Sequence, residues 1–322
     1  MRPVCFFILL ILIFSCSSRD TIHKRTILSM GTTVEIQIQT NDISLADKAI
    51  DSAFSEVQRI NDKYTVHKPN SYLNLVNNSD TFQLDDETYF LFQKCEFYNK
   101  LSNGAFDPAI GNIIRALGFE STDAEDIPDD IIRRYLSENN WKLIRLTNDK
   151  KIIKPKSLRI NLGAIAKGYA VDRMFEIVKS FGFNSILVNA GGEVRCSGKE
   201  WEIGVQHPRN KEALLGVIKL RDGSIATSGD YERYRINNGK RIHHIFNPIT
   251  GKVADECQSV TIITKNSIDA DALATAVFVL GPIDGMKLIE QINDAEALIV
   301  DKNGKLFRSK GINKFFYDIG KN

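Results

Sequence analysis

Apolar residues spaced three and four apart recur along the chain and predict its helices. Such spacing places apolar side chains on one face of a helix, where they can pack into a core. Helices are expected at residues 44–64, 86–101, 110–117, 163–181 and 267–281, and residues 126–138 read as a polar helix or loop. The segment 267–281 is the most informative, because it combines an apolar run with oxygen-bearing side chains at its start.

Between these segments, alternating or short apolar runs bounded by turn residues predict β-strands. Strands are expected at residues 26–40, 141–146, 151–153, 158–160, 185–189, 193–196, 201–205, 215–220, 224–227 and 260–264, with a closing hairpin of 297–300 and 305–309. Residues 201–205 are expected to pair with residues 193–196. Helices and strands mix without regular β-α-β alternation, so the predicted fold is α+β, with mixed, largely antiparallel sheets and packed helices.

The first twenty residues predict export. Arg2 precedes a nine-residue apolar run at 6–14, which is too short to span a bilayer but has the length of a signal-peptide core. The run ends in an apolar-x-Ser-Cys sequence that resembles the bacterial lipoprotein box, with Cys16 as the acylated residue; the alternative is an ordinary cleaved signal. We expect a lipoprotein signal peptide at 1–16, a tether at 17–25 and one domain at 26–322, undivided or in two lobes.

The composition of the chain limits the classes of molecule that are expected to bind it. Lys and Arg number 42 against 40 Asp and Glu, and no basic stripe is present, so nucleic acid is not an expected partner. The remaining cysteines of the exported chain, Cys95, Cys196 and Cys257, are widely spaced and form no CxxC pair. They are expected to be small buried residues or to include one disulfide.

Asp271 and Thr275 are the first candidates for chemistry. They lie four residues apart, so a helix sets them on one face. A carboxylate and a hydroxyl there suit a hard cation that takes oxygen ligands and holds phosphate. The alternative is a helix N-terminus in which Ser267 or Asp269 is the cap and Asp271 complements the helix dipole.

Three further segments carry candidate side chains. Residues 161–172 (NLGAIAKGYAVD) combine glycines with a helix start that could meet phosphate, although neither P-loop nor GxGxxG spacing is present, and Lys167 is either a phosphate partner or a solvated residue. Of the adjacent His243 and His244, only one can enter a given cleft, where it could act as a general base; the alternative is a solvent-facing pair beside a turn. In the segment NGAFD, Phe106 could stack on a planar ring, and Asp107 could accept hydrogen bonds from the N–H groups of that ring. The alternative is an Asn-Gly turn in which Phe106 belongs to the core and Asp107 caps a helix.

The order of these motifs resembles the ApbE family of FAD:protein FMN transferases, many of which are exported lipoproteins. MGTT, NGAFDPAIG, NLGAIAKGYAVD, ILVNAGGEVRCSG, ATSGDY, HHIFNPITG and DADALATAVFVLG follow one another from about Met30 to about Gly304. The resemblance implies that residues 26–322 form a flavin transferase domain. Such a domain binds FAD with Mg²⁺, splits the pyrophosphate, releases AMP and attaches FMN to a Thr or Ser of a target protein, here expected in a membrane electron-transport complex.

The resemblance also implies roles for individual residues. Asp271, Thr275 and the backbone carbonyl of Ala166 would hold the metal, and His244 would be the base. Because neighbouring strand residues face opposite ways, His243 is expected to be dispensable. The positions expected to contact FAD are Met30, Ala105, Phe106, Asp107, Gly163, Tyr169 and Ile245. Asn161 and Asn247 stand where the family often has Asp. A metal-dependent FAD pyrophosphatase and a non-catalytic flavin-binding lipoprotein would need the same pocket. The lipid on Cys16 would hold the protein on the bilayer of the bacterial envelope, inner or outer, facing the periplasm.

Overall fold

An eight-stranded antiparallel sheet forms the centre of the protein in the computed structural model, which describes residues 21–118, 129–138, 140–237 and 240–319. Every neighbouring pair of strands in this sheet is antiparallel. In spatial order the strands are β1 (Thr21–Ser29), β2 (Thr32–Thr40), β6 (Ile186–Ala190), β7 (Glu193–Ser197), β10 (Gly223–Gly229), β13 (Cys257–Thr264), β14 (Glu296–Asp301) and β15 (Leu306–Arg308).

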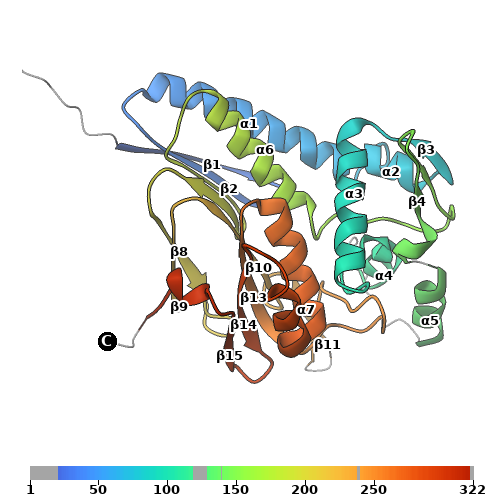
Figure 1. Ribbon diagram of the computed structural model, residues 1–322. Helices are drawn as coiled ribbons and strands as arrows, with labels where there is room; N and C mark the ends of the chain where they lie inside the picture. Colours follow the sequence, from blue (N-terminus) through green and yellow to red (C-terminus); the bar gives the residue numbers. More distant parts are fainter. Residues whose placement is uncertain (1–20, 119–128, 139, 238–239, 320–322) are drawn as a thin grey trace, which may run out of the picture.

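Three long helices cover one face of this sheet: α1 (Ile43–Tyr64), α6 (Ala166–Ser180) and α7 (Ser267–Ile289) (Figure 1). Side chains from the other face pack against a three-stranded sheet of β8 (Trp201–Gln206), β9 (Leu214–Leu220) and β16 (Phe316–Asp318). Helix α7 is long and apolar enough to cross a bilayer, but 61% of its apolar window is buried in the protein, as expected of a core helix. It continues past the predicted end through a kink at Gly281, where φ is +77°, followed by Pro282.

The segment between α1 and α6 forms a group of shorter elements at one end of these helices (Figure 1), in which only α3 is as long as α6. Its elements are α2 (Tyr72–Asn77), β3 (Thr81–Gln83), α3 (Asp86–Leu101), the 3₁₀ turn η1 (Pro108–Ile110), α4 (Gly111–Ala116), α5 (Asp129–Glu138), the 3₁₀ turn η2 (Trp141–Leu143), β4 (Arg145–Leu146) and β5 (Lys151–Ile153). The predicted α+β class with antiparallel sheets is confirmed.

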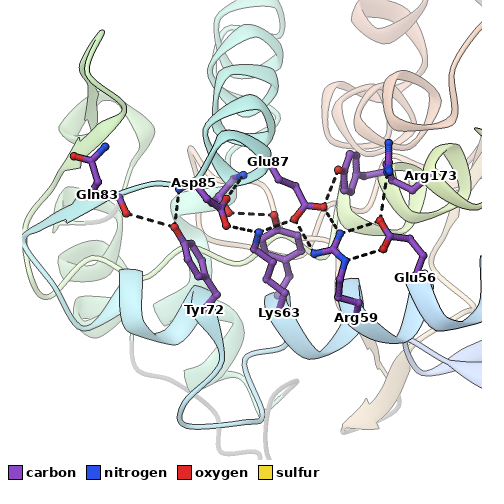
Figure 2. A network of polar contacts seen from close by, with 11 residues as sticks. Glu56, Arg59, Lys63, Tyr72, Gln83, Asp85, Glu87 and Arg173 are labelled. Carbon is purple, nitrogen blue, oxygen red and sulfur yellow. Dashed lines mark hydrogen bonds and ion pairs between the residues drawn. The ribbon is translucent and has the colours of Figure 1, made fainter.

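A network of ion pairs joins this group to the long helices (Figure 2). Glu87, in the first turn of α3, accepts hydrogen bonds from Arg59 and Lys63 of α1, both at 2.6 Å, and from the hydroxyl of Tyr169 of α6 at 2.8 Å. Glu56 joins Arg59, at 2.7 Å, to Arg173, at 3.3 Å. The carboxylate of Glu87 therefore ties α1, α3 and α6 together.

Some local predictions were wrong. The single strand expected at 26–40 is a hairpin, because Met30 and Gly31 adopt positive φ and reverse the chain. Its first arm begins at Thr21, so residues 21–25, expected in the tether, belong to β1. Residues 158–160 are not a strand, and residues 141–143 form a 3₁₀ turn.

The predicted pairing of residues 201–205 with 193–196 was also wrong. β8 pairs with β9 in the second sheet, where Trp201 and Val205 turn their buried side chains toward the large sheet. Cys95, Cys196 and Cys257 are buried and free, which confirms the small-residue alternative over a disulfide. Cys16 and the signal segment lie outside the described residues.

Candidate functional site

A cavity of about 640 Å³ opens where the long helices meet the group of shorter elements. This volume lies in the range of cofactor-binding pockets. Its wall is assembled from segments far apart in the sequence: residues 30–32 at the β1–β2 turn, the end of α1 and residues 65–67, residues 105–108, residues 161–167, and the two ends of the β11–β12 hairpin at 232–233 and 244–246. The hairpin strands are β11 (Tyr234–Asn237) and β12 (Lys240–His243).

Ten of the eleven predicted cofactor, metal and catalytic residues line this cavity. They are Met30, Ala105, Phe106, Asp107, Gly163, Ala166, His244, Ile245, Asp271 and Thr275. Tyr169 is not among the lining residues: its hydroxyl donates a hydrogen bond to Glu87 at 2.8 Å, and its ring lies 6.3 Å from that of Phe90. The hydroxyl of Tyr169 thus joins α6 to α3, and its role as a flavin contact stays a prediction.

The predicted metal-binding positions meet where α6 begins beside α7. Asp271 is 4% exposed, and its Oδ2 accepts a hydrogen bond from the backbone N–H of Gly168 at 2.8 Å. A Cβ at Gly168 would lie 2.3 Å from the carbonyl oxygen of Ser267, so only glycine permits this close approach of the two helices. The approach brings Ala166, the first residue of α6, to the same cavity wall as Asp271 and Thr275.

The N-terminus of α7 is capped by a residue of α6 and not by Ser267, Asp269 or Asp271, the residues considered as the alternative to a metal site. Asp172 of α6 accepts hydrogen bonds from the backbone N–H groups of Ser267 and Ile268, both at 2.9 Å. Neither Ser267 nor Asp269 is the N-cap, which is Asn266 and makes no side-chain capping bond. Asp271 is therefore not needed to cap α7, and its carboxylate is available to the cavity.

The donor set fits magnesium. Within the described residues, no group of three or more His, Cys, Asp or Glu side chains is arranged to hold a metal unaided. One carboxylate, one hydroxyl and one backbone carbonyl are oxygen ligands, and Mg²⁺ keeps waters or substrate phosphates in its remaining positions. The Oε2 atom of Glu193, which is 2% exposed and lines the same cavity, has no hydrogen-bond partner in the protein. An orphaned carboxylate oxygen next to a cavity is consistent with a cationic or hydrogen-bonding ligand there.

Around Lys167, the wall of the cavity holds more carboxylates than ammonium groups. The Nζ of Lys167 donates a hydrogen bond to Oε1 of Glu193, and Asp271 also faces this ammonium. Burial raises the pKa of Asp271 and of Glu193, while the charge of Lys167 opposes both shifts. Asp271 and Glu193 share this ammonium, and the carboxylate of Glu232, another lining residue, also faces it, so the wall favours additional positive charge. Lys167 is not a solvated helix residue, because its side chain is 23% exposed and paired inside the cavity.

The two histidines point in different directions. His243 is 3% exposed and packs edge-on against Phe278 of α7, with ring centroids 5.6 Å apart. His244, just past the end of β12, lines the cavity. The prediction that only one of the pair enters the cleft is confirmed, but His243 belongs to the core and not to a solvent-facing turn.

Hydrogen bonding fixes the tautomer of His244. Its Nδ1 lies 3.2 Å from the carbonyl oxygen of Arg233, which can only accept, so Nδ1 carries the proton and Nε2 keeps a lone pair. Burial lowers the pKa of His244 well below its usual value, and the positive charges of Arg233 and Lys167 lower it further. The imidazole is therefore neutral at physiological pH and can accept a proton at Nε2.

The predicted flavin wall is apolar and tightly held. Ala105 and Phe106 are 2% and 1% exposed, with Phe106 packed against Tyr98. Asp107 accepts hydrogen bonds from the backbone N–H groups of Ala109, at 2.8 Å, and Trp141, at 3.0 Å. Asp107 is thus a cap as well as a cavity residue, and burial raises its pKa to about 6.

Glu193, Glu232 and Arg233 line the cavity but were not singled out in the sequence. Glu193 lies in the GGE portion of a motif that carried the family resemblance. The sequence therefore showed a glutamate in a family motif, but it did not show that this glutamate pairs with Lys167. Its contact with Lys167 spans 26 residues of sequence and depends on β7 lying beneath α6.

The fold and cavity define a class: an α+β protein in which a buried carboxylate, a threonine hydroxyl, a neutral histidine and apolar side chains line one pocket. The chain matches the ApbE family over residues 30–299 and belongs to that family.

Its relatives agree with this assignment. The chain is 29% identical to an FAD:protein FMN transferase of Klebsiella pneumoniae (strain 342), covering 91% of this chain and 93% of the relative, and 29% identical to one of Treponema pallidum (strain Nichols), covering 92% and 90%. The crystal structure of the ApbE protein of Thermotoga maritima has a TM-score of 0.87 at 31% identity, covering 92% of this chain and all of that one. Flavin transferase ApbE from Vibrio cholerae has a TM-score of 0.81 at 26% identity, with the same coverage.

Proposed function

We propose that this protein is a magnesium-dependent FAD:protein FMN transferase that attaches FMN to a Thr or Ser hydroxyl of a target protein and releases AMP. The observation that carries the proposal is His244, whose Nε2 lone pair lines the same cavity as Asp271, Thr275 and Ala166. A proton acceptor beside a cation site is the arrangement that hydroxyl attack on a phosphoryl group requires.

In this reaction, the polar residues of the cavity would have the following roles. Asp271, Thr275 and the carbonyl of Ala166 would hold Mg²⁺, which when bound offsets negative charge on the pyrophosphate. Lys167, at the start of α6 and in the wall of the cavity, would pair its charge with the phosphates. His244 accepts the proton as the target oxygen attacks the phosphorus of the FMN half. A new P–O bond to the target forms, the pyrophosphate P–O bond breaks, and AMP leaves.

We also propose that the protein works at the bacterial envelope, anchored in the bilayer through acylated Cys16 and facing the periplasm. A target within a membrane electron-transport complex would then share its compartment. The proposal rests on the apolar run at 6–14 and the Ser-Cys ending.

The decisive experiment is incubation of the mature protein with FAD, MgCl₂ and a purified acceptor domain, with intact mass measured on the acceptor and AMP measured by chromatography. Transfer predicts an FMN mass increment on the acceptor that disappears when its Thr or Ser is replaced by Ala. Release of AMP and free FMN without an increment would support the pyrophosphatase. Binding of FAD without release of AMP would support the flavin-storage protein.

A further inference from the structure

The buried polar side chains of the group of shorter elements that do not line the cavity include two amides of α2 and one ammonium close to it. Asn74, Asn77 and Lys154 are 4%, 1% and 4% exposed. Burying amide and ammonium groups is unfavourable unless their hydrogen bonds are satisfied. The partners of these three groups therefore indicate what they hold in place.

Asn74 holds one wall of the cavity. Its Nδ2 donates hydrogen bonds to the backbone carbonyls of Val66, at 2.9 Å, and Lys68, at 2.8 Å. Val66 and His67 line the cavity, and residues 65–70 lie outside any helix or strand. The amide of Asn74 supplies this wall with bonds that regular secondary structure would otherwise provide.

Asn77 holds a second segment of the cavity wall. Its Nδ2 donates to the carbonyl of Ile160 at 2.9 Å, and its Oδ1 accepts from the N–H of the same residue at 2.7 Å. One side chain thus satisfies both backbone groups of Ile160, as a neighbouring strand would. Residues 161–164, which follow directly, line the cavity.

Lys154 fastens the same segment to the end of α2. Its Nζ donates to the carbonyl oxygens of Asn77 at 3.0 Å, Leu158 at 2.9 Å and Pro155 at 3.3 Å. The ammonium therefore holds the last turn of α2 against the loop that leads to the second wall.

The two walls are joined to each other. Asn74 and Asn77 lie three residues apart and share one face of α2. Arg159, the neighbour of Ile160, donates from Nη2 to Oδ1 of Asn74 at 2.8 Å. The backbone of Arg159 also accepts from the N–H of Gly111 at 3.0 Å, so α4 is tied to the same segment.

We propose that α2 is a clamp that sets the separation of the two cavity walls, with Asn74, Asn77 and Arg159 as positioning residues for the bound dinucleotide. The inference rests on the proposed function for the identity of that ligand, FAD. Because none of the three lines the cavity, loosening the clamp weakens FAD binding while the reacting groups, His244 and Asp271, stay as they are.

The test compares Asn77→Ala and Arg159→Ala with Asn78→Ala in the mature protein. Asn78 is the adjacent exposed asparagine of the same turn, which makes its substitution a matched control. The dissociation constant of FAD, kcat and KM for FAD, and Tm are measured for each. Asn77→Ala and Arg159→Ala should raise Kd and KM about tenfold, the usual worth of one buried hydrogen bond, with kcat at saturating FAD nearly unchanged. Asn78→Ala should match wild type, and Arg159→Lys, which keeps a donor, should recover most of the affinity.

Variants that lose Tm but bind FAD with wild-type Kd would overturn the clamp and leave only a stabilising role. If Asn77→Ala does not fold, Arg159→Ala decides, because Arg159 is only half-buried. If wild type itself fails to bind FAD, the proposed function fails, and hydrogen exchange of the ligand-free protein still tests the clamp. The clamp requires faster exchange in residues 65–68 and 158–163 in Arg159→Ala and not in Asn78→Ala; equal rates in both variants would contradict it.

Discussion

At the scale of single residues, the histidine pair separates chemistry from packing. His244→Ala should lower the rate of FMN transfer by on the order of 10²–10⁴, the usual effect of losing a general base, while FAD binding is kept. The Nδ1 bond of His244 to a carbonyl leaves Nε2 for the proton, so the loss should appear in kcat. Transfer rate and FAD affinity are measured on the same preparation, and normal transfer by this variant would exclude His244 as the base.

His243 makes the matched partner in that experiment, with the opposite expectation. From the sequence alone it looked dispensable, but it is 3% exposed and packs on Phe278. His243→Ala leaves a cavity beside α7, so unfolding should become easier by about 2 kcal/mol. Below its lowered Tm the variant should still transfer flavin. A Tm equal to wild type would show that the contact with Phe278 contributes nothing.

Asp271 allows the metal role to be measured apart from folding. Asp271→Asn removes the charge but keeps an oxygen for the N–H of Gly168, which now bonds Oδ2 at 2.8 Å. The magnesium concentration for half-maximal turnover should therefore rise at least about tenfold with little change in Tm, because a carboxylate is the strongest ligand of the set. Thr275→Val should show a milder shift. A magnesium dependence equal to wild type in both variants would rule out this pair as the cation site.

At the scale of elements, Glu87 joins α3 to α1 and α6 (Figure 2). Burial opposes its ionisation, but hydrogen bonds from Arg59, Lys63 and Tyr169 prevail and hold the pKa of Glu87 at about 2. Since this lies below the ordinary value of 4.5, the ionised group stabilises the fold above that pH, and the contribution is lost as pH falls from about 4.5 toward 2.

The pH dependence of Tm checks this. Wild-type Tm should fall between pH 5 and pH 3 by more than that of Glu87→Gln, whose side chain does not titrate. Parallel curves for the two proteins would mean that Glu87 is not the group responsible.

The N-terminus of helix α7 is capped by Asp172 of α6, so this residue should contribute to stability. Asp172→Ala removes the acceptor of two backbone N–H groups and leaves Arg195 without one of its partners. The loss of a cap is worth about 1–2 kcal/mol, to be read from denaturant unfolding. Glu176→Ala removes the half-exposed second partner of the same arginine and should cost under about 0.5 kcal/mol. Equal losses from the two would contradict the capping role.

At the scale of the whole molecule, periodicity predicted those parts whose pattern is local. The apolar spacing of α1 and α3 runs through full helices, so their extents match the sequence within a residue or two. The partner of β8 could not be found this way, because alternation identifies a strand but not its neighbour. Tyr169 shows the same limit in the site: its motif places it near the cofactor residues, and a carboxylate 82 residues away determines where its hydroxyl points.

The proposed lipid anchor on Cys16 would hold one edge of the large sheet close to the membrane. The fold begins at Thr21, so residues 17–20 alone separate the edge strand β1 from Cys16. Five chain steps reach at most about 18 Å, so an acyl chain on Cys16 would keep this end of the sheet close to the lipid surface. Cys16→Ser should leave the folded domain intact but move it from the membrane to the soluble or unprocessed fraction, as fractionation and intact mass would show. Wild-type protein found in the cytoplasm with its first sixteen residues intact would contradict export and anchoring together.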